Sequence, residues 1–131
     1  MRIYSGTDIT DLKRIAKSIT SSGDAFVLKC FTEDEISYCR SLKESRMIES
    51  FGARFAAKEA ASKALGTGIM TGGISLTDFE ITKDDRGCPH LVLHGAAKQR
   101  ADQLGITDMS VSLSHDGGYA VAYVCMLAEE K

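Results

Sequence analysis

The segment "RFAAKEAASKALGTG", residues 54–68, constrains the fold most, because its small side chains suit a helix that packs closely against other backbone. On a wheel of about 100° per residue, one stripe consists of Ala53, Ala56, Ala57, Ala60 and Ala64. Phe51, Phe55 and Leu65 fall on another side. We expect this helix to start between residues 47 and 51, to end at Gly66, and to be buried on two sides.

Glu59 and Lys63 fall between these two stripes, at the border of the packed surfaces. One interpretation is an ordinary ion pair one turn apart, which stabilises a solvated helix by about 0.2–0.5 kcal/mol. The other is a carboxylate that binds a cation and an ammonium group that binds a phosphate. The second requires another carboxylate, and Asp8 is a candidate. Asp8 follows Gly6 at the predicted end of the first strand, where it could instead cap the next helix.

The remaining patterns predict helices mainly in the first half of the chain and strands mainly in the second, which is typical of an α+β protein. Residues 1–131 have the length of a single domain. Thr32 with Glu35 fits a capping box at a helix start, and Ser41 with Glu44 is a possible second one. Further helices are expected from Leu12 and over 96–104. Strands are expected over 2–6, 76–82, 90–93, 109–115 and 119–127, the last two joined by a turn at 116–118.

Composition and net charge argue against several functional classes. The net charge of −2 disfavours bulk binding of nucleic acid. No apolar run approaches the roughly 20 residues that cross a bilayer, and the N-terminus has no signal-peptide pattern, so we expect a cytoplasmic protein without membrane attachment. The four cysteines form no CxxC pair, which argues against a zinc cluster and for reduced thiols.

Four segments in a fixed order carry a family resemblance. They are "GTDI" at 6–9, "RFAAKEAASKALGTGI" at 54–69, "DDRGCP" at 84–89 and "SLSHDGGYAVA" at 112–122. Together they span nearly the whole chain, which resembles the bacterial holo-[acyl-carrier-protein] synthases, the small class of 4′-phosphopantetheinyl transferases. The resemblance implies an α+β fold with N-terminal helices packed on a mostly antiparallel sheet. It also implies a homotrimer with the active site between protomers.

The same resemblance implies an activity and its residues. The enzyme would transfer 4′-phosphopantetheine from coenzyme A to a serine of apo-acyl carrier protein and release adenosine 3′,5′-bisphosphate, with Mg²⁺ as cofactor. Asp8 and Glu59 match the metal ligands, and Lys63 matches the lysine that meets the phosphates; these three form the catalytic set. The residues that match coenzyme A-binding positions are Arg54, Lys63, Gly66, Gly87, Pro89, Ser114 and His115. Of these, the 87–89 and 114–115 pieces are expected from the neighbouring protomer.

Basic residues on the first helix suggest how the protein partner binds. Lys13, Arg14 and Lys17 share one face of this helix, and acyl carrier proteins are acidic, so this face is a candidate docking surface. An ordinary solvated charged face is the alternative for Lys13 and Lys17. Arg14 aligns best with a basic family position.

Several positions depart from the family pattern. Tyr4, Ser5, Thr10 and Asp11 differ around the first motif, and Cys88 stands where a basic residue is common. The 116–118 turn is less basic than in many relatives. These departures leave carrier preference and coenzyme A contacts open, whereas the metal and phosphate residues match the family pattern.

Two other functions stay open from the sequence. One is a non-catalytic acyl-carrier-binding protein of the same fold, and the other is a nucleotide-binding or metal-dependent hydrolase that cleaves coenzyme A without a protein acceptor. Also open are the carrier type (fatty acid or polyketide synthesis), the preference for Mg²⁺ over Mn²⁺, and whether the general base is Glu59 or a metal-bound water.

Overall fold

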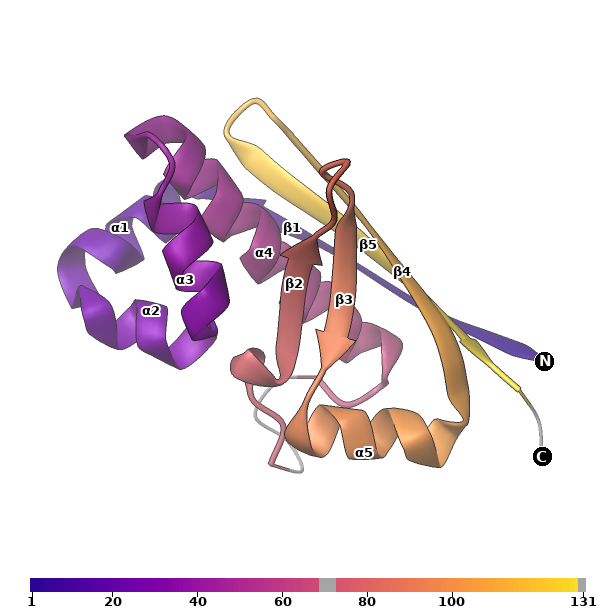
Figure 1. Cartoon of the computed structure of the whole chain (residues 1–131). Coiled ribbons are helices and arrows are strands. Elements are labelled where there is room, and N and C mark those ends of the chain that lie inside the picture. Colours follow the sequence, from indigo (N-terminus) through magenta and orange to yellow (C-terminus); the bar gives the residue numbers. More distant parts are fainter. Residues whose placement is uncertain (69–72, 130–131) are drawn as a thin grey trace.

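The computed structural model describes residues 1–68 and 73–129 (Figure 1). The elements are β1 (Arg2–Asp11), α1 (Leu12–Ser22), α2 (Asp24–Cys30), α3 (Glu33–Arg40), α4 (Glu44–Ala64), the 3-10 helix η1 (Leu76–Asp78), β2 (Phe79–Lys83), β3 (Pro89–Leu93), α5 (Gly95–Leu104), β4 (Ile106–Asp116) and β5 (Tyr119–Ala128). This order confirms the predicted α+β class. The glycine-rich segment that follows α4 lies partly outside the described residues.

The strands form two antiparallel sheets, one with the order β1-β5-β4 and one that pairs β2 with β3. Asp8 on β1 lies opposite Ala122 on β5, and His115 on β4 lies opposite Ala120. Successive side chains of β1 alternate between two faces. Asp8 is on the face toward α4, whereas Ile3 and Ile9 are exposed on the other face.

Helix α4 lies across the larger sheet, and α1 and α3 pack against it from the other side (Figure 1). The predicted burial on two sides is confirmed, because the alanine stripe packs against the sheet while Phe51 belongs to a second cluster with α1, α2 and α3. Leu65 was grouped with Phe51 in the prediction, which is wrong. It packs with the alanines, because it lies at the C-cap, where the helix ends.

Capping residues account for some helix ends but not others. Thr32 and Glu35 form the predicted capping box of α3. The second box is wrong: Ser41 is the C-cap of α3, and α4 begins at Glu44 without a side-chain cap. Helix α4 therefore starts earlier than predicted. It ends as predicted, with a glycine of positive φ (75°) at position 66.

The first strand is longer than predicted, and this changes the role of Asp8. Strand β1 continues to Asp11, which caps α1 by accepting a hydrogen bond of 2.9 Å from the backbone nitrogen of Lys13. Asp8 lies inside the strand and does not cap that helix. Helix α2 follows Gly23 and was not predicted.

Most helices and strands in the second half of the chain lie close to the positions predicted from the sequence. Helix α5 ends at Gly105 in the left-handed conformation, and Gly117 and Gly118 supply the positive φ values of the β4–β5 turn. Two boundaries differ by three residues: residues 76–78 form η1, so β2 begins only at Phe79, and β4 begins at Ile106 instead of at 109.

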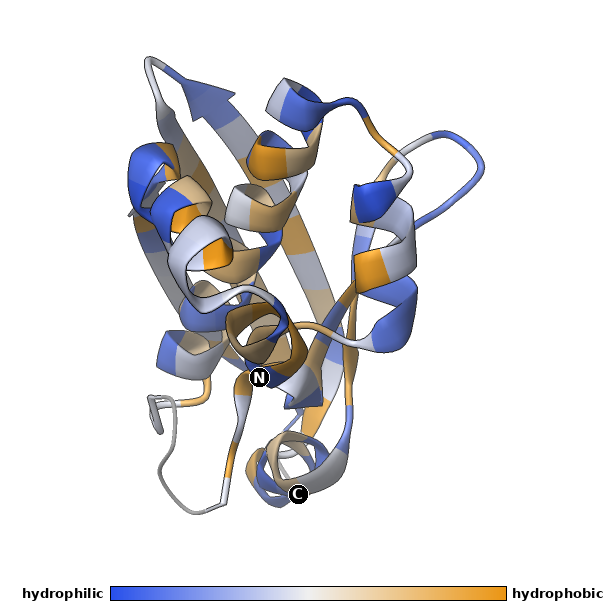
Figure 2. Cartoon of the chain, turned by 90° about the vertical axis from the view of Figure 1, so that its left-hand side faces the viewer, coloured by the Kyte–Doolittle hydropathy of each residue, from blue (hydrophilic) through white to orange (hydrophobic). Residues whose placement is uncertain are grey.

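Hydrophobic residues gather where the helices face one another and the strands, and hydrophilic residues cover much of the outer turns (Figure 2). Within the described residues, no helix is long and apolar enough to cross a membrane. All four cysteines are free thiols, and Cys30 and Cys39 are buried.

Candidate active site

Asp8, Glu59 and Lys63 come together where β1 crosses the C-terminal half of α4. Lys63 Nζ lies 3.1 Å from Asp8 Oδ1 and donates a hydrogen bond of 3.0 Å to the carbonyl oxygen of Thr7. The other carboxylate oxygen of Asp8 accepts a hydrogen bond of 3.1 Å from the Thr10 hydroxyl. Lys63 thus reaches across to β1, instead of forming the simple pair with Glu59 that the sequence also allowed.

Asp8 and Glu59 line one cavity of about 350 Å³, which we call the Asp8 cavity. Burial raises the pKa of the Glu59 carboxyl, and the charge of Asp8 raises it further, while Lys63 opposes the shift. Two carboxylates that face one cavity favour a bound cation. Among the described residues, no group of three or more His, Cys, Asp or Glu side chains is placed to hold a metal ion, so such a cation would need further ligands from water or a substrate. Mg²⁺ is bound in this way, by one or two carboxylates plus phosphate oxygens.

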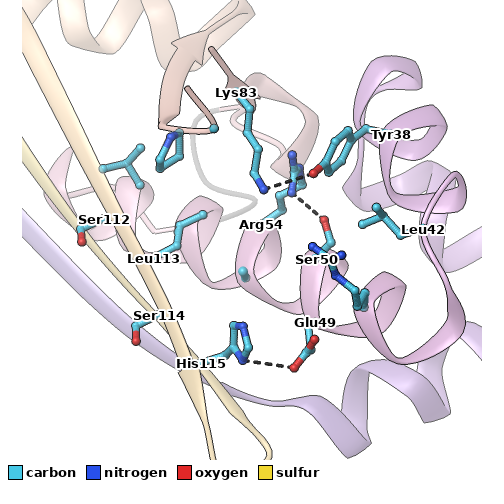
Figure 3. A pocket seen from close by; sticks show the side chains of 15 residues that line it. Tyr38, Leu42, Glu49, Ser50, Arg54, Lys83, Ser112, Leu113, Ser114 and His115 are labelled. Carbon is cyan, nitrogen blue, oxygen red and sulfur yellow. Dashed lines mark hydrogen bonds and ion pairs between the residues drawn. The ribbon is translucent and has the colours of Figure 1, made fainter. Parts of the chain in front are cut away.

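A second cavity, of about 340 Å³, lies between α3, α4, the β2–β3 hairpin and β4 (Figure 3). We call it the basic pocket. Its lining includes Tyr38, Arg46, Glu49, Arg54, Lys83 and His115, together with Gly87, Pro89 and Ser114. Four of these side chains are cationic or become so on protonation, so the pocket is suited to an anionic ligand.

Arg54 provides the sharpest indication of a ligand in the basic pocket. Its side chain is almost fully buried (3% exposed), and its guanidinium lies 4.7 Å from the centre of the Tyr38 ring and donates to Ser50 Oγ at 2.7 Å. Lys83 approaches the same ring and donates to the Tyr38 hydroxyl at 3.2 Å. Among the described residues, the buried Nε of Arg54 has no hydrogen-bond partner. A buried donor without a partner is costly, and an anion in the pocket would satisfy it.

The seven residues predicted to bind coenzyme A are divided between two places. Arg54 shares the basic pocket with 87–89 and 114–115 of its own chain, not with Glu59. The reason is helical geometry: five residues along α4 rotate the side chain by about 140°. Lys63 lies on the Asp8 side, and Gly66 is exposed just beyond the end of α4.

A model of the 4′-phosphopantetheinyl transferase superfamily matches residues 5–124. The chain belongs to this superfamily. A holo-[acyl-carrier-protein] synthase from Ruminiclostridium cellulolyticum is 48% identical over 123 residues, which are 94% of this chain and 90% of that protein. The resemblance seen in the four sequence motifs and the enzyme class that it implied are therefore confirmed.

Solved structures agree with this transferase fold. The holo-[acyl-carrier-protein] synthase of Neisseria meningitidis has a TM-score of 0.85 and 32% identity, covering 95% of this chain and 97% of that one. The synthase of Helicobacter pylori, described as a complex with coenzyme A, has a TM-score of 0.81 and 32% identity, covering 94% and 99%.

The sequence analysis missed the most buried charges of this transferase. Lys58 and Glu35 have no exposed side-chain surface, and Lys58 Nζ lies 2.7 Å from Glu35 Oε1. Lys58 also donates to the carbonyl oxygens of Leu76, at 3.1 Å, and Phe79. Burial lowers the pKa of Lys58, and Glu35 opposes this shift. The pair ties α4 to α3 and β2 directly beside Glu59.

Tyr38, Arg46, Glu49 and Lys83 in the basic pocket were also missed. They lie outside the four motifs, and each looks like an ordinary solvated residue in the sequence. Only the packing of α3 and the β2–β3 hairpin against α4 brings them together.

Proposed function

We propose that the protein transfers 4′-phosphopantetheine from coenzyme A to a serine hydroxyl of apo-acyl carrier protein, with Mg²⁺ as cofactor, and releases adenosine 3′,5′-bisphosphate. The observation that carries this proposal is that Asp8 and Glu59 line one cavity while Lys63 Nζ contacts the Asp8 carboxylate at 3.1 Å. The names of the relatives, holo-[acyl-carrier-protein] synthases, support it.

Asp8, Glu59 and Lys63 have different roles in the proposed reaction. Asp8 and Glu59 would hold Mg²⁺, which supplies charge stabilisation at the phosphate oxygens when it is bound. Lys63 is held by Asp8 and has a side chain that is about half exposed (54%), so it can reach the pyrophosphate as a point charge. The serine oxygen forms a bond to the β-phosphorus as the bond to the leaving nucleotide breaks, and the serine loses its proton. Positioning and charge stabilisation are the main tasks that remain for the protein.

The basic pocket would bind the nucleotide end of coenzyme A, because that end carries phosphate groups and Arg54 Nε needs an acceptor. This pocket and the Asp8 cavity lie on different sides of α4, so one coenzyme A molecule is best bound by the Asp8 cavity of one subunit and the basic pocket of its neighbour. Such a contact is heterologous, and a heterologous contact generates a ring when its rotation closes. We therefore propose a homotrimer with shared sites.

The outer face of the larger sheet supports self-assembly. Its exposed apolar side chains are Ile3, Ile9, Tyr119, Val121 and Tyr123. If sites are shared, mixing inactive Glu59→Ala subunits with His115→Ala subunits, which bind coenzyme A weakly, restores more activity than either variant shows alone. A protein that is fully active as a monomer by light scattering at assay concentrations would contradict the shared site.

The carrier protein is proposed to bind the α1 face made by Lys13, Arg14 and Lys17, all of which are exposed. Arg14 also lines the Asp8 cavity, so a carrier on this face would present its serine beside Asp8 and Glu59. We place the reaction in the cytoplasm, where free thiols such as Cys88 stay reduced.

Intact-mass analysis of apo-acyl carrier protein incubated with this protein, coenzyme A and Mg²⁺ tests the proposal. The expected result is a gain of one phosphopantetheine group per carrier. Carrier binding without a mass gain would indicate the non-catalytic alternative. Breakdown of coenzyme A without any acceptor would indicate a hydrolase instead.

A further inference from the structure

An ion pair crosses the mouth of the basic pocket. His115 Nδ1, from the end of β4, lies 3.1 Å from Glu49 Oε2, from the second turn of α4, and Figure 3 shows this contact joining the two walls. The two side chains are 53% and 36% exposed. A pair this exposed contributes little to folding. Its position at the pocket suggests a role in ligand binding instead.

The location of Glu49 is unusual for a carboxylate. Among the described residues that line the basic pocket, it is the one acidic side chain, alongside Arg46, Arg54, Lys83 and His115. A carboxylate that faced the ligand directly would repel a phosphate. Glu49 instead lies 3.1 Å from the imidazole of His115, which offsets its charge when the ring is protonated.

We propose that Glu49 is a positioning residue that orients His115 for the coenzyme A phosphates. The two ring nitrogens of histidine are on opposite sides of the ring, and the partner of one nitrogen sets the tautomer and orientation of the other. Nδ1 lies 3.1 Å from Glu49 Oε2, so with Nδ1–H turned to Glu49, Nε2 is the nitrogen left for the ligand. In the protonated ring, Nε2–H donates to a phosphate while Nδ1–H stays on Glu49. This inference rests on the proposed function, in which the pocket binds coenzyme A.

A double-mutant cycle on the KM for coenzyme A tests the inference. Glu49→Ala is expected to raise this KM several-fold with kcat nearly unchanged, because only binding is affected. Glu49→Gln keeps an acceptor for Nδ1–H and should recover most of the affinity. In a background that already carries His115→Ala, Glu49→Ala should have no further effect on KM, because its only route of action is gone. The matched control is Asp102→Ala, which removes a carboxylate from an exposed ion pair on α5 and should leave KM unchanged.

A second measurement is nitrogen-15 NMR of the His115 imidazole, because its signals would not change if Glu49 had only a structural role. The neutral ring of His115 should carry its proton on Nδ1, and Glu49→Ala should abolish this preference. The inference is overturned if Glu49→Ala raises the KM for coenzyme A equally in the presence and in the absence of the His115 side chain. It is also overturned if Glu49→Ala lowers this KM, because the Glu49 carboxylate would then compete with the phosphates of the ligand. If His115→Ala itself leaves the KM for coenzyme A unchanged, the coenzyme A assignment of the basic pocket fails as well.

Discussion

A side chain at Gly6 would collide with the backbone of Ala60. A Cβ atom built on Gly6 overlaps the carbonyl oxygen of Ala60 and lies 2.8 Å from the backbone nitrogen of Ala64. Strand β1 therefore lies directly on the alanine stripe of α4. Asp8 is two residues further along the same face of β1, so this contact brings its carboxylate within reach of Lys63.

Gly6→Ala is expected to lower both stability and activity, because backbone has to move to admit the methyl group. Overpacking of this kind costs about 1–3 kcal/mol, and the displaced strand would carry Asp8 away from Lys63. Urea unfolding and turnover of the same sample measure the two effects. Gly52→Ala is the matched control, because its added carbon overlaps only the end of the flexible Leu12 side chain and meets Ile15 Cγ1 at an ordinary 3.8 Å, without touching backbone. Normal turnover in Gly6→Ala would show that the close approach is not needed.

Periodicity predicts α4 well, because burial on two sides leaves a pattern that a helical wheel reveals. It predicts β1 poorly, since the inward face of that strand beyond Tyr4 contains Gly6, Asp8 and Thr10 instead of large apolar residues. Glycine and aspartate suggest a turn in a sequence. Here they reflect the close contact with α4 and the site itself. Local patterns are expected to fail at such functional positions.

Lys58 could not be distinguished from Lys63 in the sequence, since both lie in the same alanine-rich helix. Its partner Glu35 was found, but only as a capping residue. Glu35 does both: Oε1 accepts from the backbone nitrogen of Thr32 and from Lys58, and Oε2 accepts from the backbone nitrogen of Ile81. A pairing between residues so far apart depends on tertiary structure, which a local pattern does not contain.

Lys58→Met is expected to destabilise the protein by about 3–5 kcal/mol, because it leaves the buried charge of Glu35 uncompensated. Adding Glu35→Gln should recover part of this loss, so the double variant should be more stable than the sum of the single changes predicts. Urea denaturation of the four proteins measures the coupling. Lys98→Met, in an exposed pair, is the control and should change stability little. Strict additivity would contradict a coupled buried pair.

Glu80 is expected to make stability depend on pH. Its oxygens lie 2.9 Å from His94 Nε2 and 2.9 Å from the Thr32 hydroxyl. Burial alone would raise the pKa of Glu80, but these hydrogen bonds bring it below its ordinary value. The stabilisation is therefore present above the unfolded pKa of about 4.3 and is lost as the pH falls through the lower folded value.

Glu80→Gln should accordingly be less stable than the wild type at pH 7, by about 1.5–3 kcal/mol for a hydrogen-bonded charge, and the difference should shrink on acidification. Unfolding curves at several pH values between 7 and about 3 measure this trend. Glu33→Gln, an exposed change on α3, controls for the loss of one acidic charge. A difference that widens as the pH falls below about 4.3 would reverse the assigned direction.

Asp8→Asn and Glu59→Gln are expected to remain folded and to lose most activity, because a bound metal ion supplies several kcal/mol of charge stabilisation. Residual activity should need more Mg²⁺ for its half-maximal value. Titration with Mg²⁺ after chelation measures this shift. Asp102→Asn, on α5, removes an exposed carboxylate that does not line the Asp8 cavity and should leave the Mg²⁺ requirement unchanged. Near-normal turnover of either site variant at limiting Mg²⁺ would refute the metal assignment.

Arg14→Glu is expected to raise the KM for the carrier protein and to weaken the dependence of that KM on salt. Charges at the rim of an interface act mainly on association rate, and physiological salt screens them with a Debye length of about 8 Å. The KM for coenzyme A should change little, because that ligand is proposed to bind through Lys63 and the basic pocket. Steady-state kinetics at low and physiological salt separate the two constants.

Lys98→Glu on α5 reverses the same charge away from the proposed docking face, so it should leave the carrier KM unchanged (Figure 1). Arg14 lines the Asp8 cavity, so its role in docking and a role in nucleotide binding have to be distinguished. If Arg14→Glu weakens coenzyme A and leaves the carrier unaffected, α1 belongs to the nucleotide site, and the carrier protein must dock elsewhere.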